Sequence, residues 1–167
     1  CLQKYIIIDL FLHMKVKTIL VSQPEPKVEN SPYFELQQKL KILVIDDEEL
    51  DRMALMRSVR KSGFDADVFA AANETEGLVA LQEHEFDCVF LDYNLTNSTG
   101  IDFLQQHRTL LSGAQVIMVT SQGDEKLAVD AMKVGVCDYM PKNMVNPDGI
   151  AQSLRYALRL RDAADRN

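Results

Sequence analysis

From about residue 41 onward, short apolar runs alternate with longer amphipathic stretches. The apolar runs predict four strands at residues 42–45, 88–91, 116–119 and 136–140, with a weaker fifth at residues 66–70. These runs are mostly apolar on both faces, which is typical of parallel strands that helices cover on two sides.

Between the runs, hydrophobic residues recur at helical spacing in five segments, so each segment predicts a helix with one buried stripe. The stripes are Leu50, Met53, Met56 and Val59; Leu78 and Leu81; Ile101, Leu104 and Leu111; Leu127, Ala131 and Val134; and Ile150, Leu154, Ala157 and Leu158. Asn73 and Glu76 have the spacing of a capping box, and Asn146 before Pro147 predicts another cap. Gly63 and Gly135 stand where helices should stop.

Five β-α units in succession predict the fold class. Right-handed crossovers place helices on both faces of the sheet, so we expect an α/β fold with an open, doubly wound, five-stranded parallel sheet. Ligands bind such sheets beyond the carboxyl ends of the strands. Residues that carry chemistry should therefore follow the predicted strands.

Composition narrows the classes of function. The chain has 167 residues and a net charge of −7, which suits one domain with a short attachment and disfavours a general nucleic-acid binder. Three cysteines without C-x-x-C spacing exclude a disulfide framework and favour a cytoplasmic protein. The apolar stretch at residues 5–21 contains charged side chains, so we expect no membrane span.

Polar residues stand at the end of four predicted strands. Asp46 and Asp47 follow the first strand, Asp92 follows the third, Thr120 the fourth and Lys142 the fifth. Alone, the acidic pair is typical of a helix start and Thr120 of an N-cap. Together, three carboxylates at one sheet edge require a cation, and Mg²⁺ with Lys142 suits an all-oxygen cluster.

Gly100 stands eight positions after Asp92, and Tyr139 stands before Lys142. With these two positions, the residues at the strand ends resemble the receiver domain of two-component response regulators. The resemblance covers residues 41–167 and is chemotaxis-regulator-like. It implies a flavodoxin-like sheet with strand order 2-1-3-4-5 and a signalling protein rather than an enzyme.

The resemblance also implies roles for the acidic residues. Asp92 accepts a phosphoryl group from a sensor histidine kinase or a histidine phosphotransfer protein. Asp47 and Asp92 bind Mg²⁺ directly, Asp46 binds it through water, and the backbone carbonyl of Asn94 completes the protein's share of the ligands.

The remaining site residues would transmit the signal. The resemblance implies that Lys142 and Thr120 contact the phosphoryl group and that Tyr139 moves into the space that Thr120 vacates. A half-buried Tyr139 that does not move is the alternative. The surface formed by the fourth helix, fifth strand and fifth helix would then bind a protein target or a second copy of the chain, without direct contact to nucleic acid.

Two positions depart from the family pattern. Thr96 stands where receivers usually have proline, and Asn143 stands where a proline in a cis peptide usually follows the lysine. Because a cis bond without proline costs about 2.5–4 kcal/mol, we expect a trans peptide after Lys142.

Residues 1–40 are predicted to be an extension or a fused leader outside the core domain. Three prolines between residues 24 and 32 exclude a continuing helix there. Residues 14–40 resemble the start of some uroporphyrinogen-III synthases, which would imply a leader without synthase activity.

Three alternatives remain open from the sequence. The segment at residues 154–158 resembles the last helix of receivers in longer hybrid kinases or diguanylate cyclases, so the natural protein could be longer. A degenerate receiver that only binds proteins is a second alternative, motivated by Thr96 and Asn143. A haloacid-dehalogenase-like phosphatase is disfavoured, because that family needs an acid where this chain has Asn94.

Overall fold

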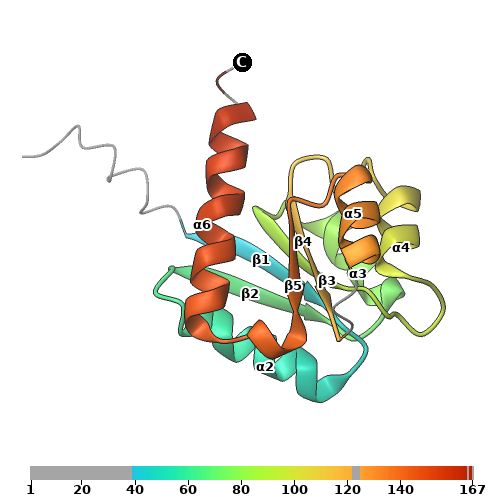
Figure 1. Ribbon diagram of the computed structural model, residues 1–167, viewed down its shortest axis with the longest axis horizontal. Coiled ribbons are helices and arrows are strands. Elements are labelled where there is room, and N and C mark those ends of the chain that lie inside the picture. The colour runs from blue at the N-terminus through green and yellow to red at the C-terminus, as the bar shows by residue number, and fades with distance from the viewer. Residues whose placement is uncertain (1–38, 122–124, 165, 167) are drawn as a thin grey trace, which may run out of the picture. The chain divides into compact units, whose positions relative to one another are not determined.

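The computed structural model describes residues 39–121, 125–164 and 166, in which strands and helices alternate (Figure 1). The strands are β1 Leu40–Ile45, β2 Ala66–Ala71, β3 Cys88–Asp92, β4 Gln115–Thr120 and β5 Asp138–Pro141. The helices are α2 Glu49–Arg60, α3 Glu74–Glu83, α4 Gly100–Gln106, α5 Glu125–Lys133 and α6 Pro147–Ala164, with a short 3₁₀ helix, η2, at Lys142–Met144. The expectations for residues 1–38 lie outside the described residues.

The five strands form one parallel sheet in the order β2-β1-β3-β4-β5. Both the doubly wound α/β class and the predicted strand order are confirmed. In register, Ile45 lies beside Leu91, Asp92 beside Val119, and Thr120 beside Pro141. The carboxyl ends of β1, β3, β4 and β5 therefore lie along one edge of the sheet.

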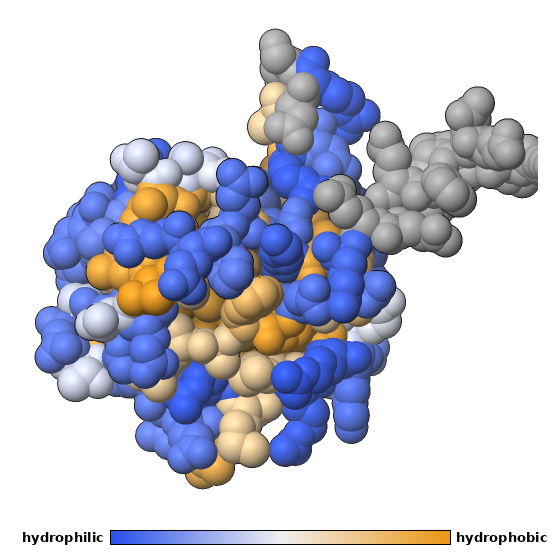
Figure 2. All heavy atoms as spheres, turned by 180° about the vertical axis from the view of Figure 1, so that it is seen from behind, coloured by the Kyte–Doolittle hydropathy of each residue, from blue (hydrophilic) through white to orange (hydrophobic). Residues whose placement is uncertain are grey.

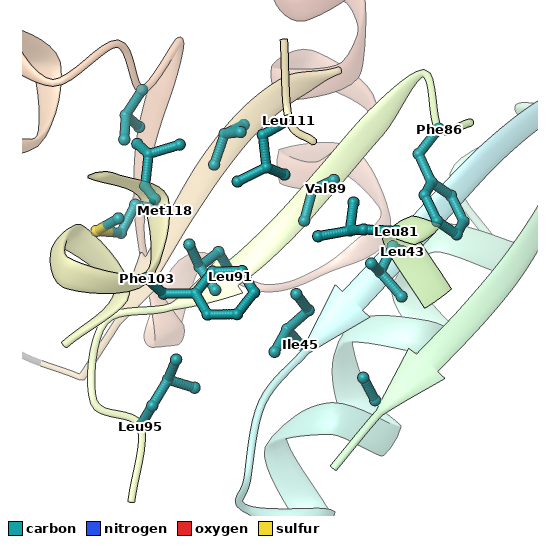
Figure 3. Close-up of a cluster of buried hydrophobic side chains, with 14 of the residues drawn as sticks. Leu43, Ile45, Leu81, Phe86, Val89, Leu91, Leu95, Phe103, Leu111 and Met118 are labelled. Atoms are coloured by element: carbon teal, nitrogen blue, oxygen red, sulfur yellow. The ribbon is translucent and has the colours of Figure 1, made fainter. Parts of the chain in front are cut away.

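Strand side chains alternate between two buried layers, as the period of two requires. One layer packs on α3, α4 and α5, and Figure 3 shows how Leu43, Ile45, Val89, Leu91 and Met118 from the strands meet Leu81 and Phe103 from the helices. The other layer contains the alternate strand residues and packs on α2 and α6. Figure 1 shows these two groups of helices on opposite sides of the sheet.

The predicted stripe of α2 is wrong in part. Leu50 is 73% exposed and Met53 is 48% exposed, whereas Leu55 and Val59 are buried. Leu50 lies in the first turn of the helix, which precedes the turns that pack on the sheet. The apolar residues of α2 contain two overlapping helical spacings, and the pattern alone does not show which one faces the core.

Figure 2 shows hydrophobic patches of the surface, seen from behind, among mostly hydrophilic residues.

The predicted helix ends are mostly confirmed. The Asn73 side chain accepts from Glu76 N at 2.9 Å, and the Asn146 side chain accepts from Gly149 N at 2.9 Å. The Glu76 carboxylate accepts from Ala72 N at 2.8 Å and from the Asn73 side-chain amide at 3.0 Å, so the backbone bond of the first capping box comes from the residue before the cap. Gly63 and Gly135 have φ values of 87° and 98°, a conformation that favours glycine.

Candidate functional site

The polar residues that follow the strands lie together at the carboxyl edge of the sheet. Asp46 comes directly after β1 and is fully buried, and Asp92 is the last residue of β3, with 2% of its surface exposed. Lys142 follows β5 and opens η2. The fold therefore positions these groups through strands that pair with one another, although they are far apart in the sequence.

Three carboxylates form a compact cluster at this edge of the sheet. Oxygen atoms of Asp46, Asp47 and Asp92 all lie within 4.8 Å of one another. The ammonium of Lys142 lies 3.1 Å from Asp46 Oδ2 and 3.2 Å from Asp92 Oδ2. This is the juxtaposition that the strand-end pattern predicts.

Local hydrogen bonds hold the acidic turn after β1. Asp46 Oδ1 accepts from the backbone N–H of Glu48 at 2.9 Å, and the Arg52 guanidinium donates to the Asp46 carbonyl at 2.7 Å. From the loop after β3, the Thr96 hydroxyl donates to Asp47 Oδ2 at 2.5 Å. The two aspartates are thus oriented by groups that are not themselves cation ligands in the predicted set.

The donor set fits a hard divalent cation. Asp46 Oδ2 and Asp92 Oδ1 are buried and have no hydrogen-bond partner among the described residues, although Lys142 lies within ion-pair distance of the first. A buried carboxylate oxygen without a partner is costly, and a cation together with its bound water would satisfy both oxygens. The cluster offers oxygen ligands alone, without His or Cys, and such sets suit Mg²⁺.

Burial and mutual repulsion change the acidity of the cluster. Burial, followed by the negative charge of Asp46, raises the pKa of Asp92 to about 6, against the opposing effect of Lys142. Burial also raises the pKa of Asp46. Burial disfavours the charged form of Lys142, but the hydrogen bond to Asp51 and the charges of Asp92 and Asp46 outweigh burial, so the pKa of Lys142 is raised.

Gly100 lies against the backbone of Asp92, where only a glycine fits. A Cβ atom at Gly100 would lie 2.5 Å from the carbonyl oxygen of Asp92, closer than any side chain allows. The Gly100 N–H donates to the Tyr93 carbonyl at 2.7 Å, and the N–H of Tyr93 donates to the Val119 carbonyl at 2.8 Å. The start of α4 therefore packs directly on the backbone that carries Asp92.

The two predicted switch residues lie on the same face of the sheet. Tyr139 is paired with Met118, two residues before the pair of Pro141 with Thr120. Thr120 is fully buried, and Tyr139 is partly buried against the layer that contains Met118. Movement of Tyr139 on activation stays a prediction.

Other predicted positions have different outcomes. Asn94 is exposed and pairs with Thr99 in an isolated antiparallel bridge, and its carbonyl stays a predicted ligand. The peptide after Lys142 is trans, as expected, since the described residues contain no cis peptide bond.

Two contacts of the site were not predicted. Asp51, in the first turn of α2, lies 2.7 Å from the Lys142 ammonium, and Thr96 bonds to Asp47. The position of Asp51, in the first helical turn after the acidic pair, could have indicated that its side chain stays near the same sheet edge.

No helix in the described part of the chain combines the length and the apolar composition that a bilayer span needs.

A family model described as the response regulator receiver domain matches residues 42–155. Among curated proteins, the chain is 31% identical over 126 residues to the alginate biosynthesis transcriptional regulatory protein AlgB of Pseudomonas aeruginosa, covering 75% of this chain and 27% of that protein. It is 28% identical over 102 residues to the chemotaxis protein CheY of Bacillus subtilis, covering 61% of this chain and 84% of CheY. The chain thus spans about a quarter of one relative and most of the other.

Solved structures share the fold. A response regulator receiver domain protein from Clostridium thermocellum is 28% identical, with a TM-score of 0.66 over 75% of this chain and 98% of that one. A response regulator protein from Burkholderia pseudomallei, whose structure contains a phosphorylated aspartic acid, a calcium ion and citrate, is 26% identical, with a TM-score of 0.62 over 78% of this chain and 75% of that one.

Proposed function

We propose, from the premise that this chain belongs to the response regulator receiver domain family, that it works as a phosphorylation-dependent signalling switch. Receiver domains are signalling proteins rather than classical enzymes, and they interact with histidine kinases or phosphotransfer proteins. The family model matches residues 42–155 of the predicted domain at residues 41–167, and the cluster of three carboxylates with Lys142 supports the function.

Asp92 is the proposed phosphoryl acceptor. One of its oxygens, Oδ1, is buried without a hydrogen-bond partner in the described part of the chain, while Oδ2 accepts from Lys142 at 3.2 Å. In the transfer, a carboxylate oxygen forms a bond to phosphorus as the bond from phosphorus to the donor histidine nitrogen breaks. The product is an acyl phosphate, and the unpaired oxygen of Asp92 is the observation that carries the proposal.

The residues around Asp92 stabilise charge during this transfer. Asp47 and Asp92 would bind Mg²⁺ directly, Asp46 would bind it through water, and the Asn94 carbonyl would complete the set. When bound, the ion neutralises charge on the phosphoryl oxygens. Lys142 supplies a second positive charge, and the Thr120 hydroxyl would donate to a phosphoryl oxygen.

The signal would pass from the pocket to a distant surface. Phosphorylation adds about 1.5–2 negative charges at the end of β3, beside Thr120 at the end of β4. Movement of Thr120 and Tyr139 would then bias the surface of α5, β5 and α6 between two states, since a bound group shifts a pre-existing equilibrium. That surface would bind a protein target or a second copy of the chain rather than nucleic acid.

The cellular setting follows from the same proposal. The chain would act in the cytoplasm, a sensor histidine kinase or a histidine phosphotransfer protein would be the phosphoryl donor, and the domain would promote both its own phosphorylation and its dephosphorylation. Residues 41–167 would form the receiver, with residues 1–40 as an extension. The relative AlgB, of which the chain spans 27%, supports a longer natural protein as the alternative context.

A phosphorylation assay tests the proposal. The purified chain is incubated with acetyl phosphate and Mg²⁺ and examined by intact-mass measurement, and beryllofluoride binding is followed in parallel by ¹⁹F NMR. We expect addition of one phosphoryl group that requires Mg²⁺, is lost in Asp92→Asn and persists in Asp65→Asn. Asp65 is a matched control because it is an exposed aspartate before β2, at the opposite edge of the sheet.

A degenerate receiver is the competing interpretation. Thr96 and Asn143, which replace two prolines of the family pattern, favour it. Failure of the wild-type chain to bind beryllofluoride or to become modified in the presence of Mg²⁺ would refute the proposed function and leave protein binding alone.

A further inference from the structure

The ammonium of Lys142 has a partner outside the predicted site. Its closest carboxylate oxygen is Asp51 Oδ2 at 2.7 Å, compared with 3.1 Å to Asp46 and 3.2 Å to Asp92. The contacts to Asp51 and to Asp92 both have hydrogen-bond geometry. The lysine that should serve the phosphoryl group is therefore held most closely by a fourth carboxylate.

Asp51 reaches Lys142 because of its position at the start of α2. Asp51 lies in the first turn of α2, which starts three residues after the buried Asp46, so its side chain stays near the same sheet edge. Lys142 heads the three-residue helix η2 and has a long, flexible side chain. The position of its ammonium is consequently determined by the anions that surround it.

The three partners differ in how well water can replace Lys142. Asp46 is fully buried and Asp92 is 2% exposed, whereas the Asp51 side chain is 43% exposed. A buried carboxylate that loses a partner stays desolvated, but an exposed carboxylate is rehydrated. Asp51 is therefore the partner that Lys142 can release at the least cost.

A lysine ammonium has three N–H donors, and here three carboxylates surround it. A phosphoryl group on Asp92 brings new acceptor oxygens that need one of these donors. Asp51 also carries a negative charge next to the group that must arrive. Both effects oppose the phosphorylated state relative to the unmodified one.

We propose that Asp51 is a positioning residue that competes with the phosphoryl group for Lys142. It holds the ammonium before transfer and yields it when Asp92 is modified, so it lowers the occupancy of the phosphorylated state. This inference rests on the proposed function of Asp92 as the acceptor.

Beryllofluoride titration at saturating Mg²⁺, measured by calorimetry, tests the competition. We expect Asp51→Asn to bind beryllofluoride about two- to fivefold more tightly than wild type, the range that a partly exposed ion pair supports. The matched control is Glu49→Gln, which removes one exposed carboxylate from the same helical turn but not a partner of Lys142, and should leave the affinity unchanged.

A double-mutant cycle shows whether Asp51 acts through Lys142. In a Lys142→Met background, Asp51→Asn should improve binding much less than in the wild type, because only the direct charge effect of Asp51 remains there; a charge effect alone would give an equal gain in both backgrounds. The Mg²⁺ dissociation constant is measured separately and should change less than the beryllofluoride constant. Asp51→Ala serves as a second variant, and circular dichroism confirms that each variant is folded.

The outcomes separate this inference from the proposed function. Unchanged or weaker beryllofluoride binding in both Asp51 variants overturns the competition, as does an equal gain in the Lys142→Met background. In both cases the wild type still binds, so the proposed function stands. Absence of binding to the wild type overturns both.

Discussion

The buried carboxyl of Asp92 should make the cation-free protein less stable as the pH rises. Burial and the neighbouring Asp46 raise the pKa of Asp92 from 3.8 to about 6. The native state therefore binds this proton more tightly than the unfolded state does. Stability from this group is fully present below about pH 4 and is lost as the pH rises through about 6.

The size of the effect follows from the shift. Each unit of pKa difference corresponds to about 1.4 kcal/mol, so a shift of roughly two units gives about 3 kcal/mol between the two limits. Because Asp92 is 2% exposed, solvent screening reduces this value little. Between about pH 4.5 and about pH 7.5, the linkage relation gives a change of about 2 kcal/mol.

Asp92→Asn removes this penalty, because the amide does not ionise. Urea unfolding is followed by circular dichroism in the presence of a chelator, for wild type and variant at both pH values. The free energy of unfolding of the variant, minus that of the wild type, should increase by about 2 kcal/mol from the lower to the higher pH. Packing differences of the amide do not depend on pH and cancel in this comparison.

Glu49→Gln is the control for loss of one negative charge. Glu49 is exposed in the first turn of α2, so its difference from wild type should stay within about 0.5 kcal/mol at either pH. A variant-minus-wild-type difference for Asp92→Asn that stays constant or falls with pH would refute the reasoning. It would mean that Lys142 stabilises the ionised carboxylate more than burial opposes it.

The site makes three further predictions. Mg²⁺ at about 100 times its dissociation constant should raise the free energy of unfolding of the wild type by about 2.7 kcal/mol, and Asp47→Asn should lose most of this gain in thermal unfolding scans. Thr96→Val should weaken Mg²⁺ binding about tenfold in calorimetry, because the Thr96 hydroxyl orients Asp47. Thr96→Ser retains the hydroxyl and should retain the affinity, so equal affinities for the two variants would contradict this role. Gly100→Ala should lower the free energy of unfolding in urea by about 1–3 kcal/mol, because the new Cβ would meet the Asp92 carbonyl. Gly113→Ala has open space around the new Cβ and should not destabilise the protein. Equal losses of stability in the two variants would contradict the packing argument.

The sheet could be predicted from the sequence because its strands are short, apolar and regularly spaced. The cluster of Asp46, Asp92 and Lys142 followed from the strand ends, since parallel strands bring their carboxyl ends to one edge. What failed were features that depend on how a helix is rotated. Leu50 and Met53 were assigned to the core although the sheet-facing side of α2 is set by packing, and the same rotation brings Asp51 to Lys142.

Thr96 shows a second limit of the sequence. The family pattern usually has proline at this position, so the sequence shows that the proline is absent. It does not show which residue the threonine side chain contacts. Its hydrogen bond to Asp47 depends on the turn that the Asn94–Thr99 bridge closes after β3. Neither the turn nor the contact has a periodic signal along the chain.

The long sequence separation within the pocket also affects how the domain is synthesised. Lys142 follows Asp92 by 50 residues and Asp51 by 91 residues. At translation rates of roughly 5–20 residues per second, the ribosome makes all the carboxylates several seconds before their ammonium counterion. During that interval the nascent chain has the acidic residues of the site without β5, and the neutralising charge becomes available only when β5 and the residue after it have been made.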